Sequence, residues 1–353
     1  MSSLTEFVEK LDCADEAERT YAAEDIGYLN IPEGVDVLLD RLRREPSRAV
    51  RDAIFQALTR IEAAVAIEGL VGLLGSDNPE IRNQAVDVLR HKGARSIPFL
   101  SAVMRDGDKD LRKLVLDVLT GVDAGTGTTG ASEIYTAALC DEDPNVVITA
   151  VENLGKLRVA GFRTRIEELL LADSHPMLTG ACLEALAAMG DELSATAIGK
   201  RFPDLSAVPD FLLASCLKAL GAVGEAGAFA EVARLLPARG RHLRPAILGA
   251  LIAIHQRDPV IPSGEGFLTA LEAIIEDGDP PLSRYQAVRA LGYLSSRDDV
   301  YAFLVSCLSS PERLVRLGAT ESLRLTQRPG TEEVLFLRSL KETDEEVLQA
   351  LIC

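Results

Sequence analysis

The apolar residues of this chain fall in a frame that recurs every 30 to 40 positions. Each occurrence has an anchor, commonly Arg, followed by a small or apolar residue three positions on and an apolar residue seven positions on. Spacings of three and four place residues on one face of a helix, so each occurrence predicts an amphipathic helix, which we name helix B. The ten anchors are Arg19, Arg51, Arg82, Arg112, Val147, Thr179, Leu213, Arg244, Arg284 and Arg316.

A second apolar run precedes each helix B and predicts a helix A. In the third unit, helix A covers 66–76 and helix B covers 79–93. The turn between the two helices often carries Asp, Ser or Pro, which cap a helix or fit its first turn. Glycine often closes helix B, as at Gly93. No stretch shows the alternation of apolar and polar residues that is typical of a strand.

The third unit shows the repeated motif most clearly. It has the form D-x-x-x-[apolar]-R-x-x-A-x-x-x-L, at Asp77, Ile81, Arg82, Ala85 and Leu89. This pattern resembles the HEAT repeat family, in particular the HEAT-like repeats named after phycobilisome lyases. The resemblance implies an all-α fold, a right-handed α-α superhelix (solenoid) of about ten HEAT-like helix pairs. Stacked pairs bury apolar faces that one pair cannot bury alone, so we predict a single solenoid over residues 1–353.

The arginine anchors lie on the flank of the apolar stripe. The planar fork of an arginine suits a half-buried carboxylate, and the turns between helices supply Asp residues. We therefore predict a structural ladder in which the arginines stack between units and pair with the Asp of a nearby turn. Its members are Arg19, Arg51, Arg82, Arg112, Arg244, Arg284 and Arg316.

The run GTGTTG at 125–130 has the spacing of the dinucleotide-binding motif G-x-G-x-x-G. That motif must follow a strand, and here a predicted helix B precedes the run and a predicted helix A follows it. We interpret the glycines as part of a linker inserted near 122–131, and we predict a second linker near 257–267. Tolerance of insertion explains both linkers, and a role as a hinge or a partner contact is the alternative.

The charge of the chain disfavours nucleic acid as a partner. Asp and Glu number 54 against 37 Lys and Arg, which gives a net charge of −17. Binding to phosphates needs a basic face, so neither nucleic acid nor an anionic membrane is expected, and a basic protein partner is favoured. The apolar runs are too short to span a membrane, the N-terminus lacks a secretory signal, and the sparse cysteines suit a reducing compartment. We therefore expect a cytoplasmic protein.

The sequence contains no set of residues with the spacing of a catalytic or metal site. None of the four histidines precedes Glu, no two histidines share a helix face, and the six cysteines lie far apart. Hydrolase, kinase and P-loop motifs are absent as well. We predict no catalytic residue, no metal and no cofactor, and hence a non-enzymatic scaffold or adaptor.

The fifth position after each anchor points away from the apolar stripe of helix B. In a HEAT-like stack helix B lines the concave surface, and five of the first six residues in this column are acidic. We predict a concave acidic groove that binds a basic segment of a partner protein, because a groove of one charge sign focuses binding. Exposed acids are also common in mid-helix, so plain solvation is the alternative. The predicted binding residues are Glu24, Asp87, Asp117, Glu152 and Glu184.

Two other functions are alternatives to a protein-binding scaffold. A phycobilin lyase-like protein would hold a tetrapyrrole, whose propionates favour Arg or Lys, and aromatic residues that could contact its rings make up only 5% of the chain. A HEAT-like nucleic-acid-binding protein would need the basic face that this chain lacks overall.

The C-terminal end, TDEEVLQALIC, is apolar where a solenoid needs a polar cap. Two arrangements account for it. A partner or a second copy covers this end, the latter being self-association, or Leu351 and Cys353 fold back onto the tenth unit.

Overall fold

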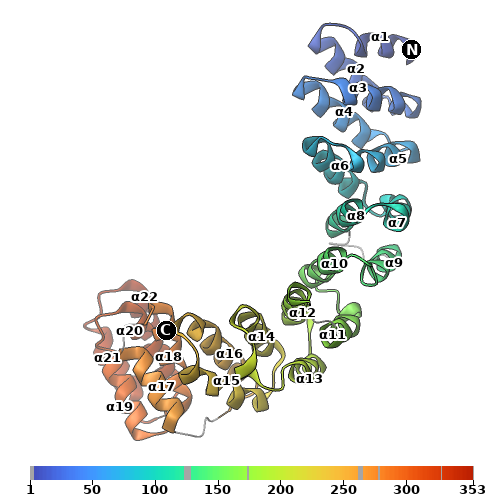
Figure 1. The fold of residues 1–353 in the computed structure, drawn as a ribbon. Coiled ribbons are helices and arrows are strands. Elements are labelled where there is room, and N and C mark those ends of the chain that lie inside the picture. The colour runs from blue at the N-terminus through green and yellow to red at the C-terminus, as the bar shows by residue number, and fades with distance from the viewer. Residues whose placement is uncertain are drawn as a thin grey trace. The chain divides into compact units, whose positions relative to one another are not determined.

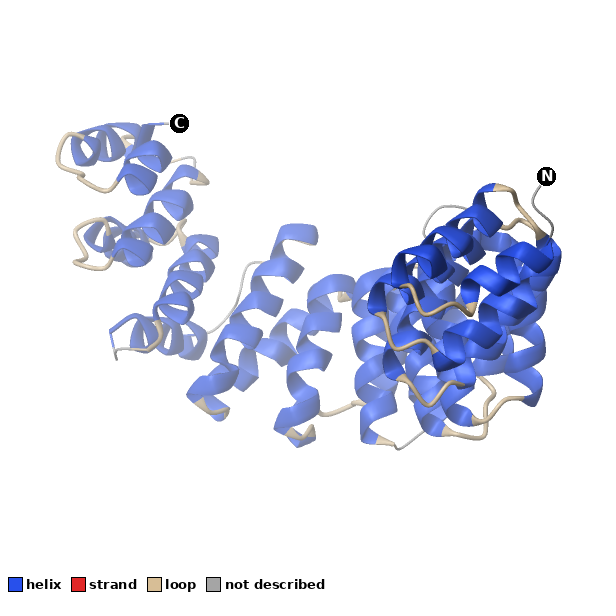
Figure 2. Cartoon of the chain, turned by 90° about the horizontal axis from the view of Figure 1, so that it is seen from above, coloured by secondary structure: helices blue, strands red, loops and turns tan. Residues whose placement is uncertain are grey.

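The protein is described by a computed structural model, which covers residues 4–122, 129–172, 175–260, 265–276, 279–326 and 328–352. Within these residues the chain forms helices and connecting loops, and no strand is found among them (Figure 2). The chain divides into two compact units, 1–157 and 158–353. The predicted all-α solenoid of HEAT-like helix pairs is confirmed.

The N-terminal unit consists of helix pairs in which the odd-numbered helix is helix A and the even-numbered helix is helix B (Figure 1). The B helices form one row, in which each packs on the next along the chain. The α-helices are α1 (Leu4–Leu11), α2 (Glu16–Tyr28), α3 (Val35–Arg44), α4 (Arg48–Arg60), α5 (Ala64–Gly72), α6 (Pro79–Lys92), α7 (Ile97–Asp106), α8 (Lys109–Val122), α9 (Thr129–Ala138) and α10 (Pro144–Leu157). Short 3-10 helices are η1 (Pro32–Gly34), η2 (Leu73–Gly75) and η3 (Gly93–Ser96).

The C-terminal unit repeats this arrangement. Its α-helices are α11 (Arg163–Ala172), α12 (Pro176–Met189), α13 (Glu192–Arg201), α14 (Asp210–Val223), α15 (Ala226–Ala238), α16 (Arg244–Arg257), α17 (Glu265–Glu276), α18 (Pro281–Leu291), α19 (Asp298–Cys307), α20 (Arg313–Arg324), α21 (Thr331–Ser339) and α22 (Glu345–Ile352). Its 3-10 helices are η5 (Ala160–Phe162), η6 (Leu205–Ala207), η7 (Arg241–Leu243) and η8 (Gly292–Leu294). The pair α21 and α22 follows the ten anchored units, and Leu351 does fold back, because α22 packs on α20 and Leu351 is buried. Cys353 lies outside the described residues.

The two predicted linkers fall partly outside the described residues. Around the glycine run, α8 ends at Val122 and α9 begins at Thr129, so helices flank it where the dinucleotide motif would need a strand. The second linker lies between the end of α16 at Arg257 and the start of α17 at Glu265. One solenoid over 1–353 with two inserted linkers stays a prediction.

The recurring frame forms the core of each unit. In α6, Ala85 and Leu89 lie three and seven positions after Arg82, and neither side chain is exposed. The start of α6 is fixed by Asn78, whose side chain accepts a hydrogen bond from the amide of Glu80 at 2.9 Å. The anchor is thus the fourth residue after the residue that caps helix B, which sets the register of the helix against its neighbours.

Six of the seven anchor arginines contact a carboxylate of the unit that follows. The best buried example is Arg19, whose Nε and Nη2 donate to Glu45 at 3.0 and 3.1 Å, while Nη1 donates to the carbonyls of its own turn. Arg82 differs, because its Nη1 donates to the carbonyl of Ser76 at 2.6 Å and no carboxylate in the described part of the chain pairs with it. The six pairs are Arg19–Glu45, Arg51–Glu80, Arg112–Asp141, Arg244–Asp279, Arg284–Glu312 and Arg316–Glu342.

Glu342 makes the stability of the C-terminal unit depend on pH. Burial alone raises the pKa of this carboxyl, but Arg316 at 3.0 Å and the amides of Asp344 and Thr343 outweigh burial and lower the pKa to about 2. A pKa below that of the unfolded chain stabilises the fold above about pH 4.5, and this stabilisation is lost as the pH falls towards 2.

We expect the melting temperature of Glu342→Gln to lie below that of the wild type at pH 7, with a difference that shrinks as the pH falls below 4.5. The glutamine resembles the protonated glutamate, so the two proteins converge once the wild-type carboxyl takes up its proton. Circular dichroism melts at a series of pH values measure this difference. A difference that stays constant down to pH 3 would show that Glu342 keeps an ordinary pKa.

Candidate functional site: an acidic groove in the N-terminal unit

The structure brings two of the five predicted binding residues together. A groove of about 780 Å³ in the N-terminal unit is lined by Asp117 of α8 and Glu152 of α10. Its other walls come from residues 74–77, which precede α6, and from the first turns of α8. Packing of α8 on both α6 and α10 holds these segments in place. We call this cavity the acidic groove.

The other predicted residues lie outside the acidic groove. Glu24 is half-buried on α2, and Asp87 is exposed on α6. Asp87 pairs with Arg90 of its own helix at 3.2 Å. Glu184 is exposed on α12 of the C-terminal unit, and its carboxylate lies 2.5 Å from the amine of Lys218. Whether these residues bind a partner stays a prediction.

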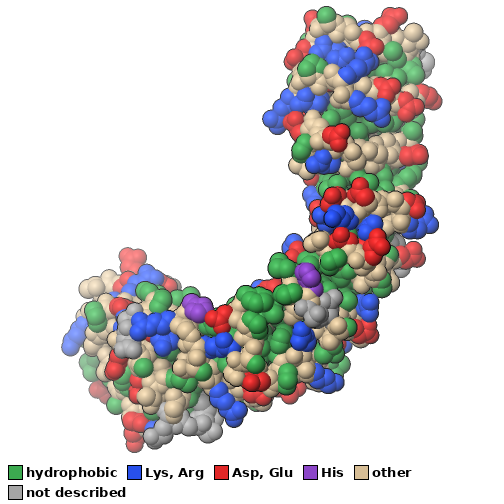
Figure 3. Space-filling model, viewed as in Figure 1, with side chains coloured by type: hydrophobic (Ala, Val, Ile, Leu, Met, Phe, Trp, Pro, Cys, Tyr) green, Lys and Arg blue, Asp and Glu red, His purple; other side chains and the backbone are tan. Residues whose placement is uncertain are grey.

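Acidic side chains outnumber basic ones in the lining of the groove. Figure 3 shows acidic and basic side chains mixed over the visible face of the N-terminal unit. Lys113 is engaged with Asp110 at 2.8 Å, and the carboxylate of Asp108 accepts amide hydrogen bonds at the start of α8. The acids of the lining are Asp77, Asp108, Asp110, Asp117 and Glu152, and the bases are Arg82, Lys113 and Lys156.

Asp77, Asp117 and Glu152 are the carboxylates of the lining that are available to a ligand. Within the described residues, no hydrogen bond or ion pair reaches the carboxylate of any of the three. Burial raises the pKa of Asp117 above its ordinary value, although the charges of Arg90, Lys156 and Lys113 oppose the shift. Because burial outweighs these three charges, a further cation beside Asp117 would favour the ionised form of its carboxyl.

Arg82 was predicted to belong to the arginine ladder and lies instead in the lining of the acidic groove. The reason lies in the turn before α8. Asp108 accepts hydrogen bonds from the amides of Asp110 and Leu111, both at 2.9 Å, and so caps α8 without contacting Arg82. The acids in this turn were the one sequence signal for the different position of Arg82. A carboxylate in this turn can either cap α8 or pair with the anchor arginine of the preceding unit.

Side chains that can bind a metal and cysteine thiols are two further kinds of reactive group in the part of the chain that the structure describes. Within the described ranges, no group of three or more His, Cys, Asp or Glu is placed to hold a metal ion. Burial raises the pKa of Cys216 to about 12 and that of Cys307 to about 11, which keeps both thiols protonated. Of the helices that the structure describes, none combines the length and apolar character that a membrane span requires.

The paired antiparallel helices and their recurring anchors define the class of the protein, an α-helical solenoid. The chain belongs to the HEAT repeat family, since the model of HEAT repeats matches residues 4–90, 97–187 and 268–352. The phycobilisome-lyase type of repeat is not identified by this match and stays a prediction. Among curated proteins, no sequence matches the chain.

Two solved structures have the same fold. A crystal structure of importin beta aligns with 98% of this chain at a TM-score of 0.59 and 14% identity, and 56% of that chain is covered. A mutant of Kap121p aligns with 99% of this chain at a TM-score of 0.55 and 13% identity, and 44% of that chain is covered. This chain therefore spans about half the length of these solenoids, and the likeness concerns the fold.

Proposed function

We propose that this protein is a non-catalytic scaffold that binds another protein, and that the acidic groove receives a basic segment of that partner. The observation that carries the proposal is the pair Asp117 and Glu152, two carboxylates that form no ion pair within the described residues and that line one groove from neighbouring helices. Membership of the HEAT repeat family supports a binding role, because stacked pairs present an extended surface with few mobile parts.

The predicted residues contribute unequally in this proposal. Asp117 and Glu152 form the centre, because their carboxylates can accept a ligand without first losing an ion pair. Asp87 and Glu184 each have a cation beside them, so a partner would have to displace Arg90 or Lys218. Glu24 has no ion pair within the described residues and extends the acidic column on α2.

The lining also indicates what kind of basic segment fits. Lys156 and Arg82 lie in the same groove as Asp117 and Glu152. A uniformly cationic surface would be repelled by Lys156 and Arg82, whereas single Lys or Arg side chains spaced along a peptide can reach the two carboxylates separately. The partner segment therefore carries spaced cations rather than a continuous basic block.

The test compares the wild type with the double variant Asp117→Asn and Glu152→Gln. The probe is a short fluorescein-labelled peptide of alternating Lys and Ala, titrated by fluorescence anisotropy at low salt. We expect about tenfold weaker binding by the variant, since each partly exposed ion pair contributes up to about 1 kcal/mol. The amide side chains keep the size of the groove and remove only its charge.

A matched control separates the groove from the overall charge. Glu68→Gln and Glu133→Gln remove two exposed carboxylates from α5 and α9, on the row of A helices. This control variant should bind the peptide like the wild type. Equal weakening in both variants would show that the peptide senses only net charge, and no weakening in the groove variant would contradict the proposed site.

We also propose that the C-terminal end of the C-terminal unit is a second contact surface. Phe336 on α21 and Ile352 on α22 are exposed there although both are apolar. Large exposed apolar side chains that lie together are typical of interaction sites.

A further inference from the structure

Some of the ion pairs between successive units recur at fixed positions. In three units a carboxylate lies three residues before the first residue of helix B, and it accepts a hydrogen bond from the amide two residues further on. The anchor arginine of the preceding unit pairs with this carboxylate. The three pairs are Arg19–Glu45 before α4, Arg112–Asp141 before α10 and Arg316–Glu342 before α22.

A second arginine joins two of these pairs. Arg41 lies 22 positions after Arg19 and donates to Glu45 at 2.6 Å. Arg338 occupies the same position after its own anchor and donates to Glu342 at 2.8 Å. Each of these two buried carboxylates therefore has two guanidinium groups beside it.

The junction between α12 and α14 lacks both members of the ion pair. Its anchor is Thr179, and the residue three positions before α14 is Ala207. The second arginine is present, because Arg201 lies 22 positions after the anchor and ends α13. Two small side chains thus lie where an arginine and a carboxylate pair at other junctions.

A pocket of about 370 Å³ lies at this junction. Thr179 of α12, Arg201 of α13 and Ala207 before α14 all line it. Small side chains in place of long ones leave space between packed helices. The pocket therefore occupies the place of the ion pair, and we call it the Thr179 pocket.

Two polar groups of the Thr179 pocket lack a partner. The Oγ of Thr179 and the Nε of Arg201 are both buried, and neither forms a hydrogen bond within the described residues. Thr179 is only 2% exposed. A buried donor without an acceptor costs free energy, so an acceptor that enters the pocket would be stabilised there.

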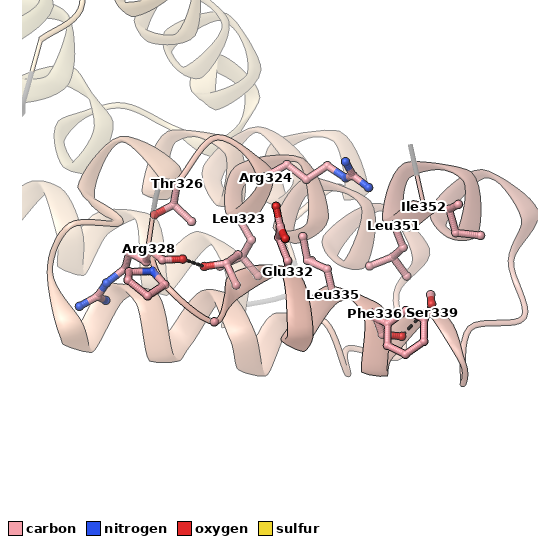
Figure 4. Close-up of a pocket in the computed structure, with 13 residues that line it drawn as sticks. Leu323, Arg324, Thr326, Arg328, Glu332, Leu335, Phe336, Ser339, Leu351 and Ile352 are labelled. Atoms are coloured by element: carbon pink, nitrogen blue, oxygen red, sulfur yellow. Dashed lines mark hydrogen bonds between the residues drawn. The ribbon is translucent and has the colours of Figure 1, made fainter.

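The arginines of the larger pocket at α21 and α22 are engaged, in contrast to Arg201. That pocket of about 830 Å³ is lined by Arg324 and Arg328 (Figure 4). Arg324 donates to the carbonyl of Ala350, and Arg328 donates to the carboxylate of Asp298. A position at a pocket does not by itself leave an arginine unpaired, so we attribute the unpaired Nε of Arg201 to the absent carboxylate.

Asp204 also lines the Thr179 pocket but does not replace that carboxylate. Its Oδ1 accepts hydrogen bonds from the amide and the hydroxyl of Ser206 at 2.9 and 2.6 Å. Within the part of the chain that the structure describes, no ion pair joins Asp204 to Arg201. The positive charge of Arg201 is thus available to an anion from outside the chain.

Apolar side chains surround these polar groups. Most of the other lining residues are apolar, and among them Phe211 of α14 is 67% exposed. Met177, next to Pro176 of the lining, is 67% exposed as well. Apolar surface therefore continues beyond the pocket, as a peptide segment would require and a single small anion would not.

We propose that the Thr179 pocket binds an Asp or Glu side chain of a partner protein, with an apolar residue beside it in the partner sequence. The carboxylate takes the place that Glu45 and Glu342 have at their junctions and accepts hydrogen bonds from Arg201 and the hydroxyl of Thr179. This site goes beyond the function proposed above, because it takes a ligand of the opposite charge and lies in the other compact unit.

The test is calorimetric titration of the full chain with an acetylated and amidated peptide that has one Glu between two Leu residues. The matched peptide carries Gln in place of Glu. The wild type should bind the Glu peptide at least about tenfold more tightly, since a charge-assisted hydrogen bond is stronger than a neutral one. Arg201→Gln should remove this preference. Arg105→Gln, which changes an exposed arginine on α7, should keep it.

Two further variants test the origin of the pocket and the sign of the ligand charge. Ala207→Glu supplies the carboxylate from within the chain, so it should weaken binding of the Glu peptide about tenfold or more. Asp204→Asn removes a like charge and should strengthen that binding, whereas it would weaken the binding of a cation. Circular dichroism confirms that each variant is folded.

Three results would each overturn the proposal. They are equal binding of the Glu and Gln peptides by the wild type, a Glu preference that survives both Arg201→Gln and Ala207→Glu, and no binding of the Glu peptide at millimolar concentration. The Lys–Ala peptide should bind the Arg201→Gln variant as it binds the wild type, which keeps a failure of the Thr179 pocket distinct from a failure of the acidic groove.

Discussion

Replacing Glu45 with alanine is expected to lower the free energy of unfolding by about 3–5 kcal/mol, the cost of leaving a buried charge without its partner. Glu45 accepts hydrogen bonds from Arg19 at 3.0 and 3.1 Å, from Arg41 at 2.6 Å and from the amide of Ser47 at 2.9 Å. Both Glu45 and Arg19 are buried. Burial raises the pKa of Glu45, but these contacts outweigh it and hold the pKa below its usual value, so the carboxylate is charged at neutral pH.

Urea denaturation followed by circular dichroism measures this change. The control is Asp40→Ala, which removes a carboxylate 2.6 Å from Arg43 in a pair that is exposed on both sides. We expect the control to cost less than about 1 kcal/mol, because water screens exposed pairs. If the two variants lose similar amounts of unfolding free energy, the buried contact between Arg19 and Glu45 stabilises the first two units no more than an exposed ion pair does.

Replacing Gly27 with leucine is expected to cost about 1–3 kcal/mol, because the extra side chain has no room between two helices. A Cβ atom at Gly27 would lie 2.6 Å from the Cα of Ala57, which is main chain and cannot move aside alone. The substitution would push α2 away from α4 and disturb the first two units. Thermal and urea unfolding of the variant give the loss directly.

The control for Gly27 is Gly72→Ala on α5, where an added Cβ would have no atom within 4 Å. Alanine favours the helix over glycine, so this variant should keep or gain up to about 1 kcal/mol of stability. Equal behaviour at the two positions would contradict the close approach of α2 and α4 as the reason for glycine at position 27.

The pattern of anchors predicted the fold well for a physical reason. Residues three and seven positions after an anchor must be apolar to fill the space between neighbouring helices, as Ala85 and Leu89 do. Because this requirement repeats in every unit, the frame is recognisable even where the anchor is not Arg, as at Val147 and Thr179. The presence of helices and their order along the chain follow from the repeated frame.

The site was harder to predict, since it depends on which carboxylate finds a cation. The acidic column places Asp87 and Asp117 in equivalent positions, yet Asp87 has Arg90 beside it and Asp117 does not pair. The rotamers of long basic side chains decide which carboxylate forms an ion pair, and the sequence pattern does not specify those rotamers. The same holds for Lys92, which reaches the carbonyls of Thr59 and Ile61 at 2.7 and 2.6 Å and is buried between units.

The two ends of the described helices bear on how a repeat array of this kind can lengthen by duplication. A helix pair added beyond α22 would cover Ile352, in the way that each earlier unit is covered by the next. A pair added before α1 would cover Tyr21 and Leu29, which are exposed, together with the charged Asp25 and Glu18. Apolar side chains are therefore exposed at both ends, and the packing of the helices alone sets no preferred end for a further repeat.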